Sequence, residues 1–333
     1  MITIGSDKLD DCIFGIPGFK KNHLFRRLTD EIVEAYPQLI DGDRRCAGGR
    51  LRFRTDSTRF EITIRVSNLY PDRGMSYYQA NVANVFIGDG PSAVYGGIVT
   101  ADDLYNTEYI SGTFYKSDKK ENVTVYLPRN PTVEDITVKI EDDAEFSAPL
   151  PYSISKPFVF YGSSITENGH TSSPNGYPAL VSRWLDADFL NLGISGMAKG
   201  EEKMAEYAAS FDAGIFIYDY DHNAPSPDYL EKTHEKFFKI YRSFRPDTPV
   251  IMMSRPSADG GAEDTEKRKK IILNTYNNAV NNGDKNVYFI DGMTFFDGFD
   301  REVCTTDRTH PNDIGHYLMA VRVADLIKKI LCK

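Results

Sequence analysis

Residues 158–166 read Phe158-Val159-Phe160-Tyr161-Gly162-Ser163-Ser164-Ile165-Thr166, an apolar and aromatic run that ends in a glycine and a cluster of serine and threonine. Four consecutive apolar residues are typical of a strand buried on both faces, and Gly162 lets the backbone turn sharply where that strand ends. A serine at the carboxyl end of a buried parallel strand lies where open α/β sheets place their chemistry. The stretch therefore predicts either a catalytic serine, with Ser164 as the candidate, or an ordinary turn rich in hydroxyl groups.

The sequence after this strand alternates between strands and helices. Apolar runs predict further buried strands over residues 189–192, 214–218, 248–253 and 286–290. Amphipathic segments predict helices over residues 177–185, 199–210, 226–244, 263–281 and 313–331. Five buried strands with intervening helices indicate a parallel sheet covered on both faces. We therefore expect an α/β domain of the three-layer, flavodoxin-like kind.

Residues 1 to about 150 carry short strand-like runs instead. Residues 51–54 and 60–66 alternate between apolar and polar side chains, as strands with one buried face do. Further strands are expected over residues 85–87, 123–127 and 136–140, whereas a weak helical period over residues 28–40 is interrupted by Pro37. This spacing predicts a jelly-roll-like β-sandwich of two antiparallel sheets. The proline-rich stretch 147–151 predicts the connection between a β-sandwich domain, 1–152, and an α/β domain, 153–333.

Composition limits the possible classes of protein. The chain has 333 residues, 41% of them hydrophobic, and no segment approaches the roughly 20 apolar residues of a membrane span. Its net charge of −9 argues against nucleic acid as a partner, and the basic run 267–270 is expected on the solvated face of a helix. We expect neither a nucleic-acid nor a membrane partner.

Cysteine usage and the first residues bear on the compartment. The four cysteines are scattered, with no Cys-x-x-Cys spacing; they are Cys12, Cys46, Cys304 and Cys332. This pattern disfavours a zinc site or a disulfide framework. Residues 1–8 lack a basic region followed by an apolar run, so no signal peptide is predicted. We expect a reduced, cytoplasmic protein, and a secreted mature form stays open.

Three further segments place chemistry at the same sheet edge as Ser164. In Asp307-Arg308-Thr309-His310-Pro311-Asn312, the Asp-x-x-His spacing lets one loop present a carboxylate to an imidazole, and the proline keeps His310 out of the following helix. Asn191-Leu192-Gly193-Ile194-Ser195-Gly196 leaves the second strand in a turn whose backbone amide can point at an oxyanion. Asn223, after the third strand, can donate its side-chain amide to the same oxyanion.

These four segments resemble the four sequence blocks of the SGNH (GDSL-like) hydrolase superfamily over about residues 157–333. The first block usually reads Gly-Asp-Ser, and here Ser163 stands in the aspartate position. Gly196 matches the second block, although Gly193 is only three residues away. In the third block the asparagine is kept as Asn223, while its usual neighbours have changed.

The resemblance implies the role of each residue. Ser164 would be the nucleophile, His310 the base and Asp307 its orienting partner, with the Ser164 and Gly196 amides and the Asn223 side chain as the oxyanion hole. Ser163 is the alternative nucleophile, although it lies nearer the strand. The expected activity is hydrolysis of short-chain, acetyl-type esters on carbohydrates or glycosylated molecules through an acyl-enzyme. A catalytically weak glycan-binding protein is the alternative, because six tyrosines of the first half could form an aromatic platform: Tyr77, Tyr78, Tyr95, Tyr105, Tyr109 and Tyr115.

The remaining histidines have weaker assignments. His222, beside Asn223, is expected to touch substrate or to make a structural hydrogen bond, and His170 is expected to line the pocket. His316 lies inside the last predicted helix, where packing is the better expectation. Asp219, Asp221 and His222 are poor candidates for a metal site, because a parallel strand end rarely turns three neighbouring side chains inward. We expect no metal and no cofactor.

Overall fold

The computed structural model describes residues 1–256 and 263–332. Its contacts group into two compact units. The first comprises Met1–Ser153 with Ser172–Pro174, and the second comprises Ile154–Thr171 with the described residues from Asn175 onward. The two units are described separately below, and the boundary of two independent domains at residues 152 and 153 stays a prediction. Among the described residues, none of the helices is both long and apolar enough to cross a bilayer.

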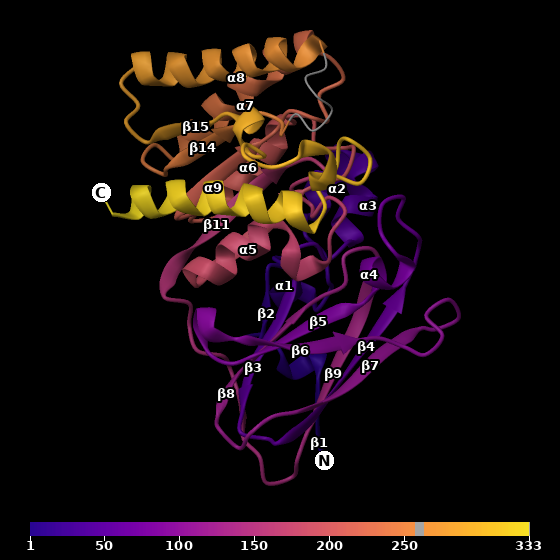
Figure 1. Ribbon diagram of the computed structural model, residues 1–333. Coiled ribbons are helices and arrows are strands. Elements are labelled where there is room, and N and C mark those ends of the chain that lie inside the picture. Colours follow the sequence, from indigo (N-terminus) through magenta and orange to yellow (C-terminus); the bar gives the residue numbers. More distant parts are fainter. Residues whose placement is uncertain (257–262, 333) are drawn as a thin grey trace. The chain divides into compact units, whose positions relative to one another are not determined.

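The first unit is the predicted sandwich of two antiparallel sheets (Figure 1). One sheet has the order β1-β9-β4-β7 and is built from β1 (Ile2–Gly5), β9 (Thr132–Ile140), β4 (Arg59–Ser67) and β7 (Tyr109–Tyr115). The other has the order β10-β3-β8-β5-β6, from β10 (Phe146–Ser147), β3 (Arg50–Thr55), β8 (Glu121–Tyr126), β5 (Ala83–Ile87) and β6 (Val94–Val99), and β2 (Ile13–Phe14) pairs with β3. Short helices connect the strands: α1 (Phe19–Asn22), α2 (Asp30–Ala35), α3 (Ile40–Arg44) and α4 (Tyr77–Asn81).

Apolar side chains alternate with polar ones along the strands, and the apolar ones form the core between the sheets. In β4, Phe60, Ile62 and Ile64 are fully buried, whereas the polar residues between them lie on the outer face. The buried side chains of both sheets form one cluster, in which the rings of Phe53 and Phe60 meet edge to face with centroids 5.9 Å apart. The predicted interruption at Pro37 is confirmed, since α2 ends at Ala35 and a short 3-10 turn over Pro37–Leu39 follows.

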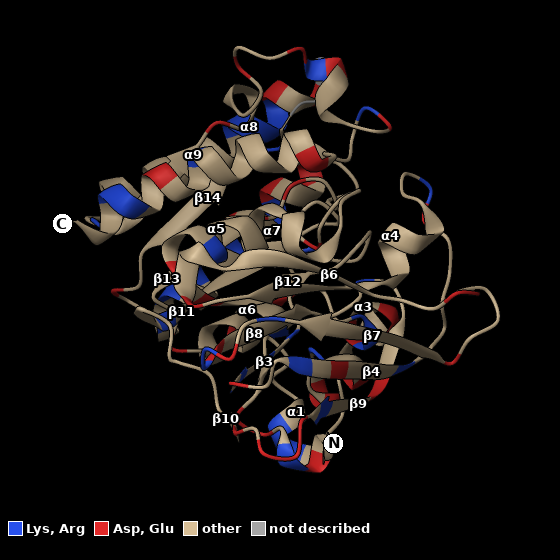
Figure 2. Cartoon of the chain, turned by 60° about the horizontal axis from the view of Figure 1, so that its bottom comes forward, with Lys and Arg blue, Asp and Glu red and all other residues tan. Residues whose placement is uncertain are grey.

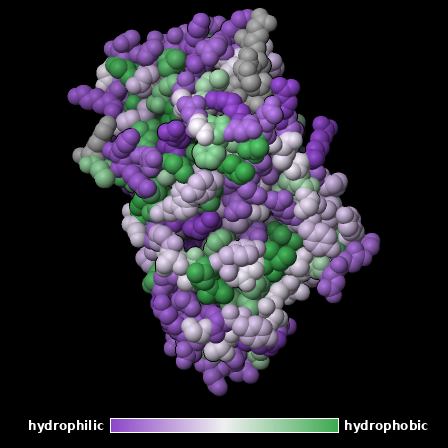
Figure 3. Space-filling model, viewed as in Figure 1, coloured by the Kyte–Doolittle hydropathy of each residue, from purple (hydrophilic) through white to green (hydrophobic). Residues whose placement is uncertain are grey.

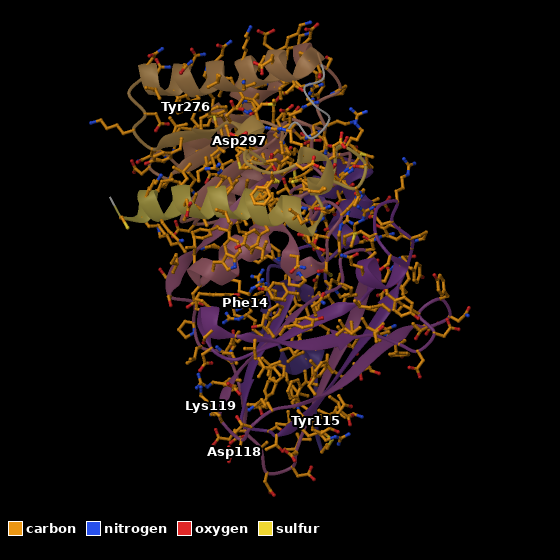
Figure 4. All side chains as sticks on the ribbon, in the orientation of Figure 1. Phe14, Tyr115, Asp118, Lys119, Tyr276 and Asp297 are labelled. Carbon is orange, nitrogen blue, oxygen red and sulfur yellow. The ribbon has the colours of Figure 1, made fainter. Side chains whose placement is uncertain are left out.

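Several tyrosines of the sandwich lie on its surface. Tyr95, Tyr105, Tyr109 and Tyr115 are each more than half exposed, and the Tyr105 ring stacks on Tyr77 with centroids 4.2 Å apart. Figure 4 labels Tyr115 beside the turn that carries Asp118 and Lys119, between β7 and β8. Apolar patches also lie on the face of the molecule that Figure 3 shows. The exposed apolar residues of the sandwich include Val94 and Ile98 of β6.

The second unit contains the predicted parallel sheet, with the order β12-β11-β13-β14-β15 (Figure 1). Its strands are β11 (Ile154–Gly162), β12 (Ala187–Gly193), β13 (Ile215–Asp219), β14 (Val250–Met253) and β15 (Val287–Ile290). Its helices are α5 (Tyr177–Leu185), α6 (Glu202–Ser210), α7 (Pro227–Phe244), α8 (Glu263–Asn281) and α9 (Asp313–Leu331). Helices α5 and α9 pack together, as do α6, α7 and α8, so two helix layers enclose the sheet.

Packing against these helices buries both faces of the sheet. Phe216 of β13 stacks on Tyr241 of α7 with centroids 4.0 Å apart, and Tyr276 of α8, labelled in Figure 4, contacts Phe289 of β15. Acidic and basic residues are interspersed along α8 and α9 (Figure 2), and most of them are exposed, although Arg268 is buried. Buried inner faces and charged outer faces are what the amphipathic pattern predicts.

The pairing register of the parallel strands brings the ends of β11, β12 and β13 to one edge of the sheet. Gly162 at the end of β11 pairs with Gly193 of β12 on one side and with Asp219 of β13 on the other. The turns that follow these strands therefore leave the sheet side by side. This edge holds the predicted catalytic segments.

Candidate active site

Ser164, His310 and Asp307 form one chain of polar contacts. Ser164 Oγ lies 2.9 Å from His310 Nε2, and His310 Nδ1 lies 2.7 Å from Asp307 Oδ2. Because a neutral imidazole donates through one nitrogen and accepts through the other, Nδ1–H donates to the carboxylate and Nε2 accepts from the serine hydroxyl. Ser164 is 7% exposed, whereas the side chains of His310 and Asp307 are 25% and 42% exposed. The geometry fits a serine nucleophile with its general base.

The loop before α9 fixes the position of the imidazole. Asn312 caps α9 by accepting from the backbone amides of Ile314 at 3.0 Å and Gly315 at 3.2 Å. Thr305 and Pro311 form an isolated antiparallel bridge, which closes the segment between them into a loop. His310 therefore stays outside the helix, as the proline predicts.

Asp307 is held in its ionised form by hydrogen bonds. Partial burial acts to raise the pKa of Asp307, but the His310 backbone N–H at 2.7 Å, the His310 ring and the Thr309 N–H at 3.1 Å together lower that pKa below its ordinary value. A carboxylate that stays charged can keep the imidazole in the tautomer that accepts from Ser164.

Close backbone packing shapes the turn that carries Ser164. A Cβ on Gly162 would lie 2.5 Å from the Asp219 carbonyl oxygen and would also overlap the Thr166 hydroxyl, so only glycine fits there. The Ser163 hydroxyl accepts from the Ile165 amide at 3.2 Å, and Ser163 is 2% exposed. The hydroxyl of Ser163 therefore faces its own turn, whereas that of Ser164 faces His310.

Two backbone amides, of Ser164 and Gly196, and the side-chain amide of Asn223 are the predicted oxyanion donors. Within residues 1–256 and 263–332, no hydrogen bond is found from the backbone N–H of Ser164 or of Gly196. Gly196 is exposed and has a φ of +73°, a conformation that favours glycine. By contrast, the Gly193 N–H donates to Asn191 Oδ1 at 2.9 Å. Gly196 is thus the better candidate for an oxyanion donor.

The turn with Gly196 is held from two sides. Asn223 Nδ2 donates to the Ile194 carbonyl oxygen at 2.9 Å, which leaves the second hydrogen of that amide group for another acceptor. Glu167, which is fully buried, accepts from the Ser195 N–H through Oε2 at 2.9 Å. Glu167 was not singled out in the sequence, because nothing local marks a carboxylate whose partner is a backbone amide.

A buried ion-pair network clamps the loop that carries Asn223. The Asp221 carboxylate accepts from the Arg255 backbone N–H at 2.9 Å. Arg268 of α8 donates to the carbonyl oxygens of Asp221 and Ala224, both at 3.0 Å, and its Nε lies 2.7 Å from Asp264. Arg268 is 4% exposed, so the expectation of a solvated run over residues 267–270 is wrong at this position. The i, i+4 spacing of Asp264 and Arg268, which allows an ion pair along a helix, was the sequence signal that Arg268 has a partner.

The other histidines occupy three different environments. His316 is buried and accepts from the Tyr177 backbone N–H at 3.1 Å through Nδ1, which fits a packing role. His222 is half-buried, and burial together with Arg255, His310 and Arg268 lowers its pKa well below the ordinary value, so it is neutral. His170 contacts His310 with ring centroids 4.4 Å apart.

One group of potential metal ligands is found among the described residues, and it includes Asp307 and His310. The ligand atoms of His170, Asp307 and His310 lie within 4.8 Å of one another. Both His310 nitrogens already contact Ser164 and Asp307, and His170 Nδ1 contacts the Thr306 hydroxyl. A metal ion would have to break these contacts, so the arrangement fits acid–base chemistry better than metal binding.

Asp219 is a fully buried carboxyl group that contacts Thr166 in the turn after Ser164. Burial raises its pKa to about 7, although it accepts hydrogen bonds from the Thr166 hydroxyl at 2.8 Å and the Tyr177 hydroxyl at 3.0 Å. Between about pH 4, where a free aspartate titrates, and pH 7 the folded protein therefore keeps a proton that the unfolded chain has lost. This residue makes the free energy of unfolding fall as pH rises through that window.

We expect Asp219→Asn to remove the contribution of Asp219 to the pH dependence of the unfolding free energy. The difference in unfolding free energy, variant minus wild type, should rise with pH between about 4 and 7, by up to about 1.4 kcal/mol per unit. Urea unfolding followed by circular dichroism at several pH values measures it. A difference that stays constant over this window would show that Asp219 titrates normally.

The sequence matches one family over most of the second unit. Residues 155–331 match the GDSL-like lipase/acylhydrolase family. A comparison with curated protein sequences found no match.

Solved structures share the fold over nearly the full chain. A protein described as a GDSL-like lipase, from Bacteroides ovatus, is 24% identical with a TM-score of 0.86, and the match covers 99% of this chain and 98% of that one. A salicylyl-acyltransferase from a tetracycline biosynthetic pathway is 19% identical with a TM-score of 0.72, over 90% and 87%. An acetyl xylan esterase from the rumen bacterium Butyrivibrio proteoclasticus is 14% identical with a TM-score of 0.60, over 99% of both chains. Because the family match spans more than half of the sequence, and as the resemblance to SGNH hydrolases predicted, the protein belongs to the GDSL-like lipase/acylhydrolase family.

Proposed function

We propose that the protein is a serine esterase that removes short acyl groups, acetyl above all, from carbohydrate or glycosylated substrates. The observation that carries the proposal is the chain of contacts from Ser164 through His310 to Asp307. Membership of an acylhydrolase family supports the same reaction class. The sugar-ester substrate has a weaker support, which is the shared fold with a protein described as an acetyl xylan esterase.

The reaction would run through an acyl-enzyme. Ser164 Oγ attacks the ester carbonyl carbon while its proton passes to His310 Nε2, and Asp307 stabilises the resulting imidazolium. The tetrahedral oxyanion accepts hydrogen bonds from the amides of Ser164 and Gly196 and from Asn223. Collapse expels the alcohol, which takes the proton from His310. Water then attacks the acyl group, gives a proton to His310 and releases the carboxylic acid, and the proton returns to Ser164.

A substrate series tests the acyl and alcohol parts separately. With p-nitrophenyl esters, we expect kcat/KM to be highest for acetate and to fall as the acyl chain lengthens. With acetylated xylo-oligosaccharides, we expect release of acetate, measured enzymatically. Equal rates for acetate and octanoate esters would contradict the short-chain proposal, and inertness toward acetylated sugars despite cleavage of p-nitrophenyl acetate would contradict the carbohydrate proposal.

A second function, glycan binding with weak catalysis, is favoured by one feature of the sandwich. The stacked pair Tyr77 and Tyr105 and the exposed Tyr95 offer aromatic faces of the kind that stack on sugar rings. Isothermal titration of Ser164→Ala with unmodified xylo-oligosaccharides tests this function, because binding without turnover is then measured alone. Heat of binding that disappears in a Tyr105→Ala variant would support it, and absence of any heat would remove it.

We expect Asn223→Ala to lower kcat by about 10²–10³-fold, the usual effect of losing one oxyanion donor. KM should change little, because the oxyanion forms only in the transition state. Steady-state kinetics with p-nitrophenyl acetate measure both constants, and thermal melting checks that the loop of Ile194 is still folded. An unchanged kcat would place the Asn223 amide outside the oxyanion hole.

A further inference from the structure

His170 contacts the catalytic loop with its ring and with its backbone. Its imidazole lies against that of His310, with centroids 4.4 Å apart and planes inclined by 34°. Its Nδ1 contacts the Thr306 hydroxyl, and its backbone N–H donates to the Pro311 carbonyl oxygen at 3.1 Å. Since His170 is 7% exposed, its ring is largely covered by protein.

Neighbouring contacts hold the two segments together on both sides of this ring pair. Gly169 has a φ of +52°, and a Cβ there would lie 2.9 Å from the Pro311 carbonyl oxygen. The Thr171 hydroxyl donates to Asp313 Oδ1. Asn175 Nδ2 donates to the same oxygen at 3.1 Å. The turn that begins with Ser164 is therefore fastened to the loop of His310 along several residues.

The hydrogen bonds of His310 restrain one motion of the ring only weakly. Contacts at Nδ1 and Nε2 hold the two edges of the ring, but rotation about the axis that joins these two nitrogens changes both contacts little. The His310 side chain is 25% exposed, so solvent leaves it room to tilt. A ring packed on its face opposes that tilt, and an error of about 1 Å in a reacting group can cost roughly 100-fold in rate.

We propose that His170 is a positioning residue, which holds the face of the His310 imidazole while Thr306 holds His170. This inference rests on the proposed esterase function and adds to it a residue that acts through the base. It differs from the expectation that His170 lines the substrate pocket. A substrate ligand would affect KM, whereas a positioning residue affects kcat.

Variants of His170 and Thr306 separate these roles with p-nitrophenyl acetate. We expect His170→Ala to lower kcat about 100-fold with KM unchanged within twofold. His170→Phe keeps a flat ring and should recover at least tenfold of that loss. Thr306→Val should lower kcat in the same direction, and the double variant with His170→Ala should lose no more than His170→Ala alone, because both act through one contact. The exposed Thr113→Val on β7 serves as the matched control.

The outcomes are distinct. A raised KM with unchanged kcat in His170→Ala and His170→Phe would make His170 a substrate ligand, and full additivity of the two losses would remove Thr306 from the arrangement; either result overturns the proposal. If the wild type hydrolyses no ester, the proposed function fails, yet the positioning claim is still read from NMR. The Nδ1 proton of His310 should exchange with water faster in His170→Ala than in the wild type, and an unchanged exchange rate overturns the claim.

Discussion

Ser164→Ala should lower kcat for p-nitrophenyl acetate by about 10⁶-fold, the scale found when a serine hydrolase loses its nucleophile. The loss follows from the geometry, because the hydroxyl 2.9 Å from His310 Nε2 is the atom that would form the acyl bond. Initial rates at high enzyme concentration, with circular dichroism to confirm folding, measure the effect.

Ser163→Ala is the matched control for this variant. Its hydroxyl lies one residue away and accepts from the Ile165 amide within the turn, so its removal should cost less than tenfold in kcat. A collapse of activity in Ser163→Ala while Ser164→Ala stays active would exchange the roles of the two serines.

Asp307→Asn should lower kcat by roughly 10⁴-fold. The side-chain amide of asparagine can donate to His310 Nδ1 where the carboxylate accepts, which favours the tautomer with a proton on Nε2, and such an imidazole cannot take the Ser164 proton. The lowered pKa of Asp307 indicates that the carboxylate keeps this role under mildly acidic conditions.

A control for this charge change is available in the same part of the chain. Asp297, labelled in Figure 4, contacts Arg301 at 3.2 Å, so Asp297→Asn should leave kcat unchanged. Steady-state kinetics on both variants decide the matter, and a loss of less than tenfold in Asp307→Asn would mean that another group orients the base.

The sequence predicted the second unit closely and the first only in outline. Residues 177–185 and 313–331 are helical over the predicted range, because apolar periodicity marks both, and Asn312 caps the second. Strands β6 and β7 were missed, since Gly96, Gly97 and Gly112 interrupt them and exposed tyrosines break the apolar alternation. Pairing at the sandwich edges makes these segments strands, and that is a tertiary effect which local pattern does not carry.

The candidate site shows the same limit. The order of residues and turn chemistry marked Ser164, His310 and Asn223, because each follows a strand or precedes a helix. The side chains that hold these residues in place have no comparable sequence pattern. Glu167 looked like any polar turn residue and Arg268 like part of a solvated basic run, yet both are buried against backbone groups far away in the sequence. Such partners follow from packing between elements.

The central claim is that the hydroxyl of residue 164 is the nucleophile, and covalent labelling tests it most directly. After incubation with a fluorophosphonate, peptide mass spectrometry should find the phosphonyl group on Ser164 of the wild type, with loss of hydrolysis in proportion to labelling. Ser164→Ala should stay unlabelled. A label on Ser163 or on another residue, or full inactivation with Ser164 unmodified, would contradict the account.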